Sequence, residues 1–86
     1  MSSISIRWDR RAVKEARALP KKARTRVFQA VSELADDPLR GGALSGEWKG
    51  LHRLRVGVYR VIYAFDGKEL LVSVIRVGNR GRVYRR

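Results

Sequence analysis

The fold of this chain is decided by residues 51–77, which read LHRLRVGVYRVIYAFDGKELLVSVIRV. Apolar and polar residues alternate through Leu51–Val56 and again through Tyr59–Phe65, which is the period of a β-strand with one buried face. A reversal near Gly57 separates these two strands. A two-residue turn at Asp66-Gly67 is expected before the next one, because Asp-Gly is a strong hairpin signal. The stretch therefore predicts a meander of three antiparallel strands.

The N-terminal half predicts one strand and two helices. Residues 2–8 alternate around Ile4 and Ile6 like a short strand. Residues 10–19 and 21–35 carry aliphatic side chains at helical spacing, with Pro20 between them. Residues 36–50 hold repeated glycines and read as a loop. The order predicts one α+β domain over residues 1–86. Its N-terminal strand joins the meander in a mainly antiparallel sheet, and both helices cover one face.

The charge of the chain points to a polyanionic partner. Its 20 Lys and Arg residues exceed its 8 Asp and Glu residues and give a net charge of +12, which favours nucleic acid. No apolar stretch approaches the roughly 20 residues of a membrane span, and no signal peptide is recognised. With no Cys and one His, we expect no metal site, no cofactor and a cytoplasmic location.

The alternation gathers arginines on one face of the predicted sheet. Arg53 and Arg55 share a side of the second strand, and Arg60 falls on the same side of its hairpin neighbour. Like charges placed so close are unfavourable without an anion between them, so we interpret the cluster as a phosphate site. The alternative is a solvated strand face that serves solubility. His52 is expected on the opposite, helix-covered face in a structural role.

The C-terminal residues extend the positive charge. Residues 76–86 hold five arginines and Tyr84 but no acid. Arg80 and Arg82 follow Gly78 and are expected to fold over the same face as the arginine cluster. Tyr84 suits stacking on an unpaired base or donation to a phosphate; its alternative role is packing that fixes the tail.

Two motifs resemble those of the RelE/ParE toxin superfamily. They are GLHRLRVGVYRVIY at residues 50–63 and VIRVGNRGRVYR at residues 74–85, and the resemblance covers nearly the whole chain. RelE-type members are ribosome-dependent mRNA endoribonucleases held inactive by an antitoxin, whereas ParE-type members share the fold and inhibit DNA gyrase. The chain looks closer to the RelE type, because Arg60, Arg80 and Tyr84 match catalytic positions of that group.

The chain departs from the RelE pattern at three positions. Arg53 stands where well-studied RelE enzymes carry a lysine, Leu51 stands at a second such lysine position, and Asn79 replaces a common histidine. The resemblance implies a catalytic set of Arg53, Arg60, Arg80 and Tyr84. We expect Arg55, Arg76 and Arg82 to bind RNA.

Cleavage of this type needs the 2′-OH to attack the adjacent phosphate and give a 2′,3′-cyclic phosphate. Arginines suit the stabilisation of charge on the phosphorane, but arginine is effectively never deprotonated and makes a poor base. Tyr84, His52 or a ribosomal group remains as the candidate base. We therefore expect a slow, arginine-driven enzyme, with the ribosome positioning the mRNA.

The expected partners are a cognate antitoxin, the ribosome and mRNA, with operator DNA contacted only through the antitoxin. Two alternatives stay open. One is a ParE-like, non-catalytic toxin that inhibits gyrase by binding, and the other is a basic nucleic-acid-binding module without catalysis.

Overall fold

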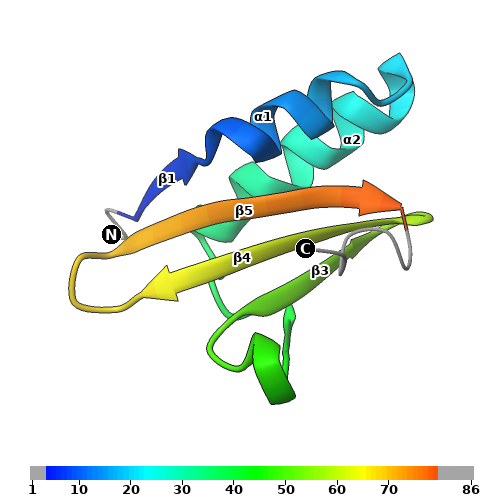
Figure 1. Ribbon diagram of the computed structural model, residues 1–86. Coiled ribbons are helices and arrows are strands. Elements are labelled where there is room, and N and C mark those ends of the chain that lie inside the picture. Colours follow the sequence, from blue (N-terminus) through cyan, green and yellow to red (C-terminus); the bar gives the residue numbers. More distant parts are fainter. Residues whose placement is uncertain (1–3, 80–86) are drawn as a thin grey trace.

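The computed structural model describes residues 4–79 as a five-stranded sheet with two helices packed on one face (Figure 1). The elements follow in the order β1 (Ser5–Trp8), α1 (Arg10–Arg17), α2 (Lys21–Ser32), the short 3₁₀ helix η1 (Glu33–Ala35), β2 (Gly42–Ala43), the 3₁₀ helix η2 (Gly46–Trp48), β3 (His52–Val56), β4 (Tyr59–Asp66) and β5 (Leu71–Asn79). The predicted α+β class is confirmed.

The strands lie side by side in the order β1-β5-β4-β3-β2. β3, β4 and β5 form the predicted antiparallel meander, and β1 adds to its far side as the parallel neighbour of β5. β2 pairs with only the start of β3, Gly42 opposite Arg53 and Ala43 opposite His52. The sheet is therefore mixed but mostly antiparallel.

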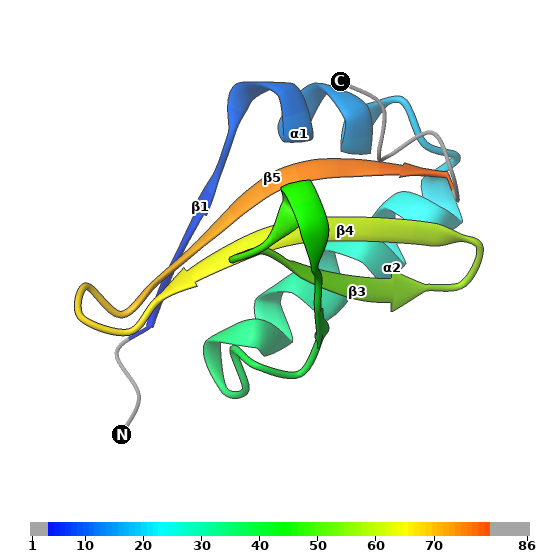
Figure 2. The same cartoon turned by 60° about the horizontal axis from the view of Figure 1, so that its bottom comes forward.

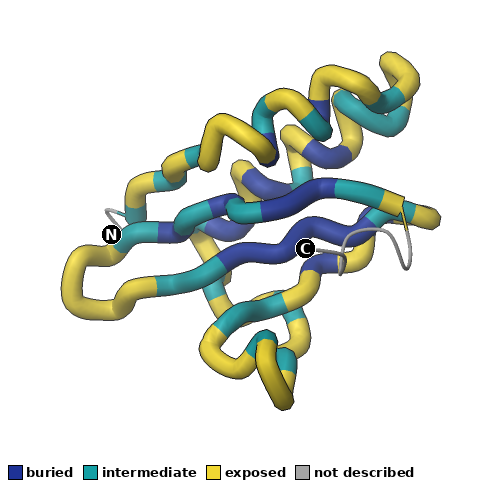
Figure 3. Tube along the Cα trace, in the orientation of Figure 1, coloured by how far each residue is buried: buried dark blue, intermediate teal, exposed yellow. Residues whose placement is uncertain are grey.

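The core lies between the sheet and the helices. Helix α1 contributes Ala12 and Ala16, and α2 contributes Val27 and Val31, all with at most 1% of their surface exposed. These small side chains let both helices approach the apolar face of the three long strands, which Figure 3 shows as buried in their central parts. None of the described helices is long and apolar enough to cross a membrane.

The helix bounds differ slightly from the prediction. Helix α1 ends at Arg17, and the expected second helix divides into α2 and the 3₁₀ turn η1. The expected loop of residues 36–50 contains β2 and η2. Figure 2 shows the segment with η2 in front of β4, on the side of the sheet away from α1 and α2. Neither a Gly-Ala strand nor a one-turn helix has a period that alternation can reveal.

The prediction of a two-residue turn at Asp66-Gly67 is wrong. β4 continues to Asp66 and β5 begins only at Leu71, so four residues form the connection. The Asp66 carboxylate accepts hydrogen bonds from the backbone N–H groups of Lys68 (2.9 Å) and Glu69 (3.2 Å). This side-chain capping replaces a tight turn, because aspartate readily bonds the backbone two residues ahead.

A β-bulge divides β5 into two parts. Ile62 pairs with Arg76 while the next residue, Tyr63, pairs with Val74, so one extra residue, Ile75, lies in β5. Before the bulge Val72 and Val74 face the helices; after it the alternation is reversed. The bulge thereby places Arg76 opposite Ile62, on the helix-free face.

Candidate nucleic-acid interface

Two arginines face each other across the hairpin of β3 and β4. Arg55 pairs with Arg60, and Arg53 pairs with Ile62 two positions away. Directly paired residues project to the same side of a sheet. The predicted grouping of Arg53, Arg55 and Arg60 on one face is therefore confirmed, and it is the face that carries neither α1 nor α2.

The hairpin turn brings Arg55 and Arg60 close. Gly57 has a φ of +61°, the left-handed conformation that a two-residue turn with glycine at its first position uses. In such a hairpin Val56 and Tyr59 form the hydrogen-bonded pair, so Arg55 and Arg60 form the narrow pair, with Cα atoms about 4.5 Å apart. The like charges of the two guanidinium groups repel most strongly in this register.

The surroundings of the two arginines differ. Arg60 is only 6% exposed and donates a long hydrogen bond to the carbonyl of Tyr59 (3.4 Å), whereas Arg55 is exposed. Together with Gly57, Val58 and Asn79 they line an open depression of about 360 Å³. A mostly buried guanidinium beside an exposed one can hold an anion at fixed geometry, because the buried cation loses little side-chain entropy on binding.

Arg53 and Arg55 also line a second depression on the β2 side. Arg40 is the third arginine in its lining, and the Arg40 guanidinium forms an ion pair with the carboxylate of Glu33 (2.6 Å). Arg55 belongs to both depressions. The cationic surface therefore continues along β3 from the β2 edge to the hairpin turn.

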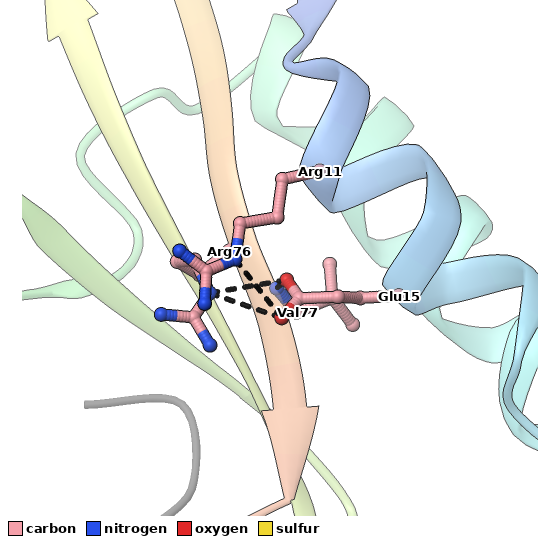
Figure 4. A network of polar contacts seen from close by, with 4 residues as sticks. All are labelled: Arg11, Glu15, Arg76 and Val77. Atoms are coloured by element: carbon pink, nitrogen blue, oxygen red, sulfur yellow. Dashed lines mark hydrogen bonds and ion pairs between the residues drawn. The ribbon is translucent and has the colours of Figure 1, made fainter. Parts of the chain in front are cut away.

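Arg76 is held by a carboxylate from helix α1 (Figure 4). Its Nε atom lies 3.0 and 3.2 Å from the two carboxylate oxygens of Glu15, and the backbone N–H of Val77 donates to the same carboxylate at 2.9 Å. Arg76 is 8% exposed. β1 stops pairing at Val74, so Glu15 takes the place of a strand on the outer edge of β5. The role of Arg76 in RNA binding stays a prediction.

The opposite face holds the sole histidine and a buried tyrosine. The rings of His52 and Tyr63 lie 5.3 Å apart at 25°, and the hydroxyl of Tyr63 accepts a hydrogen bond from Gly41 N–H at 2.9 Å. Burial raises the pKa of Tyr63; the charge of Asp37 adds to this effect, and the bond from Gly41 opposes it. Because Tyr63 is a core residue, its partner His52 lies on the helix side, as predicted, away from the Arg55–Arg60 pair.

The remaining predicted site residues, Arg80, Arg82 and Tyr84, lie outside the described residues. Within residues 4–79 no group of three His, Cys, Asp or Glu side chains is placed to hold a metal ion. Sequence reasoning missed Glu15, whose carboxylate contacts the predicted site residue Arg76. No local signal reveals this contact, since 61 residues separate Glu15 from Arg76.

The sequence and the fold of this chain match those of a known family. Residues 6–84 match the model of the family described as the ParE toxin of type II toxin–antitoxin systems, parDE. The chain belongs to this toxin family. Toxin RelE of Mycobacterium tuberculosis is 34% identical over 76 residues, which are 86% of this chain and 78% of that relative.

Solved structures extend the similarity to the three-dimensional arrangement. The toxin–antitoxin complex RelBE2 of Mycobacterium tuberculosis contains a chain with a TM-score of 0.83 and 29% identity, covering 90% of this chain and 98% of that one. A chain of the RelE–RelB complex of the archaeon Pyrococcus horikoshii has a TM-score of 0.80 and 28% identity, and the match covers 95% of this chain and 99% of that one. The isolated RelE toxin of Escherichia coli has a TM-score of 0.78 and 26% identity, and the match covers 95% of this chain and 92% of that one. This toxin is thus RelE-like, and two of these three relatives were solved with an antitoxin.

Proposed function

We propose that this toxin is a ribosome-dependent mRNA endoribonuclease that a cognate antitoxin neutralises. The observation that carries the proposal is the narrow Arg55–Arg60 pair, with one guanidinium buried and the other exposed. The pair would contact the scissile phosphate and stabilise the additional negative charge of the phosphorane as the 2′-OH attacks. Such fixed donors typically contribute a factor of about 10² to 10³ to the rate.

The roles of the other site residues follow from their positions. Arg53 is two residues from Arg55 along the same face of β3, a spacing that suits a neighbouring phosphate of the bound strand. The sequence-based assignment adds Arg80, Arg82 and Tyr84 to this site. His52 is an unsuitable base because it faces the helix layer, so Tyr84 or a ribosomal group would accept the 2′-OH proton.

The partners follow from the relatives. The similarity to RelE chains solved with RelB antitoxins supports a small antitoxin as the partner of this toxin. Ribosomes and mRNA in the cytoplasm would be its targets, and operator DNA would be contacted through the antitoxin. A second candidate is inhibition of DNA gyrase by binding, which the match of residues 6–84 to the ParE toxin model favours.

The test is single-turnover cleavage of mRNA on purified, programmed ribosomes. Arg60→Ala is expected to slow cleavage by about 100-fold or more, and Arg60→Lys by less, because lysine keeps the charge. Arg17→Ala, an exposed arginine at the end of α1, is the matched control and is expected to have no effect. A loss of only a few-fold for a folded Arg60→Ala variant would contradict the catalytic assignment.

Induction in growing cells separates the two candidates. New mRNA ends within translated codons, absent with Arg60→Ala and with Arg80→Ala, are expected from the nuclease. Growth arrest with intact mRNA and inhibited DNA supercoiling would instead assign the toxin to the gyrase-binding type.

A further inference from the structure

A further pair of arginines meets near the end of β5, outside the two depressions described above. The Nε atom of Arg11 lies 3.8 Å from Glu15 Oε2, and the Nε atom of Arg76 lies 3.0 Å from the same oxygen. The side chain of Arg11 extends from α1 toward Arg76, and both guanidinium groups lie on the same side of the Glu15 carboxylate (Figure 4). One carboxylate thus brings two guanidinium groups together.

The two arginines differ in what they contribute to the fold. Arg76 is mostly buried and donates to Glu15. The side chain of Arg11 is 56% exposed, and its 3.8 Å separation from Glu15 is too long for a hydrogen bond. An exposed ion pair of this kind contributes little to stability. The N–H groups of Arg11 can therefore donate to a ligand without loss of a structural contact.

This pair lies next to the Arg55–Arg60 depression. Arg60 pairs with Gly78, and Arg76 lies two residues before Gly78 on the same face of β5. Diagonal neighbours of this kind have their Cα atoms about 7–8 Å apart. Arg76 therefore connects the depression with the outer edge of β5, where Arg11 arrives from the helix layer.

We propose that Arg11 and Arg76 form a second phosphate-binding site, which holds the RNA strand at a phosphate neighbouring the one bound by Arg55 and Arg60. Arg11 would donate to a phosphodiester oxygen, and Glu15 would be a positioning residue that keeps both guanidinium groups at the edge of β5. The inference rests on the proposed function, because the strand is the RNA that the depression would bind.

The charges of the cluster favour an anion of this kind. Two guanidinium groups that share one carboxylate repel each other, and a bound phosphate lowers this repulsion. The planar, five-donor fork of arginine also matches the two unesterified oxygens of a phosphodiester. Arg11 is therefore expected to add affinity for the strand rather than stability to the fold.

The probe is a fluorescein-labelled 2′-O-methyl decauridine, which cannot be cleaved by 2′-OH attack, titrated with the full chain without ribosomes. Arg11→Ala is expected to weaken binding at least fivefold at low salt. The slope of log affinity against log salt concentration is expected to become shallower by about 0.7, the value for one phosphate contact with a single strand. Circular dichroism is expected to show an unchanged fold, because Arg11 is exposed.

Arg10→Ala is the matched control. Arg10 is exposed and directly precedes Arg11 in α1, so its loss changes the net charge equally, but its side chain projects about 100° away around the helix axis. This variant is expected to change the affinity less than twofold and to keep the salt slope. Equal weakening by Arg10→Ala and Arg11→Ala would reduce the contact to general electrostatic attraction and overturn the proposal.

A decauridine with methylphosphonate linkages tests the chemistry of the contact, because a neutral methyl group replaces the charged oxygen of each phosphate. The wild type and Arg11→Ala are expected to bind this probe equally. If Arg11→Ala still weakens its binding fivefold, Arg11 contacts a base or a sugar and the proposed phosphate site is wrong. Failure of the wild type to bind the charged decauridine at low salt would also overturn the proposal.

The outcomes separate this site from the proposed activity. A chain that passes the decauridine tests but fails to cleave mRNA on ribosomes would refute the nuclease activity alone. A chain that cleaves mRNA, while Arg11→Ala binds the charged decauridine as tightly as the wild type, would refute the second phosphate site alone.

Discussion

The contact of Glu15 with the end of β5 gives a quantitative prediction. Glu15→Ala removes the carboxylate that accepts from Arg76 Nε at 3.0 and 3.2 Å and from Val77 N–H at 2.9 Å. Arg76 is 8% and Val77 1% exposed, so water replaces these bonds poorly. Hydrogen bonds to a charged group contribute about 1.5–3 kcal/mol each. The side chain of Glu15 is 24% exposed, so the hydrogen bonds together contribute less than this sum. We expect Glu15→Ala to lower the free energy of unfolding by about 2–4 kcal/mol.

The assay is urea unfolding followed by circular dichroism and tryptophan fluorescence, with a thermal scan beside it. For a chain of this size, 1 kcal/mol corresponds to about 4–8 °C in Tm, so Glu15→Ala is expected to lower Tm by about 10–20 °C. In a double-mutant cycle with Arg76→Ala, the two single variants and the double variant are compared by their loss of unfolding free energy. The loss in the double variant is expected to be smaller than the sum of the two single losses by at least about 1 kcal/mol. This coupling is expected because Glu15→Ala takes the carboxylate acceptor from Arg76 Nε while the Arg76 side chain stays mostly buried.

The control is Arg11→Ala. The Nε atom of Arg11 lies 3.8 Å from Glu15 Oε2 and its side chain is 56% exposed, so its loss is expected to cost less than about 0.5 kcal/mol. Two results would refute the reasoning that Glu15 stabilises the end of β5. One is a Glu15→Ala variant as stable as Arg11→Ala, and the other is a double-mutant cycle that shows no coupling energy.

Three further predictions concern backbone fit and the buried tyrosine. Gly41→Ala is expected to cost about 1–3 kcal/mol in urea unfolding, because its Cβ would lie 2.5 Å from the carbonyl oxygen of Arg53, while Gly42→Ala, with nothing within 4 Å, should cost far less. Tyr63→Phe is expected to cost about 1–2 kcal/mol at neutral pH by leaving Gly41 N–H without its acceptor. Because burial raises the pKa of Tyr63, the stability from its neutral form is complete below about pH 10 and lost as pH rises through the raised pKa. Unfolding free energy should therefore fall less steeply above pH 10 in Tyr63→Phe than in the wild type, and an equal slope would contradict this. Leu70→Gly is expected to raise stability by about 0.5–1 kcal/mol, because Leu70 has a φ of +53°; a lower Tm would show that its side-chain contacts outweigh the strain.

Alternation was sufficient to predict which side chains share a face of β3 and β4. Leu54 and Val56 are buried and Arg53 and Arg55 exposed, as a half-buried strand requires. The two-residue turn at Gly57 then fixed the register that sets Arg55 opposite Arg60. Local sequence thus predicted the described part of the arginine cluster, because neighbouring strands and a short turn leave few alternatives.

The remaining features depend on contacts that a local pattern does not contain. The bulge at Ile75 is invisible to alternation, because an apolar residue fits both a regular strand and a bulge. The length of the connection after Asp66 depends on where its carboxylate bonds the backbone. The pairing of Glu15 with Arg76 requires the packing of α1 beside β5, which only the assembled fold defines.

The bulge in β5 also bears on how related toxins can vary. The extra residue, Ile75, separates the strand into two parts. Substitutions in the core can therefore alter the part that contains Val72 and Val74, while the part from Arg76 onward keeps its orientation. Deleting this single residue would exchange the faces of everything C-terminal to it in the strand. Homologous toxins should therefore tolerate substitution at this position far better than a change in strand length there.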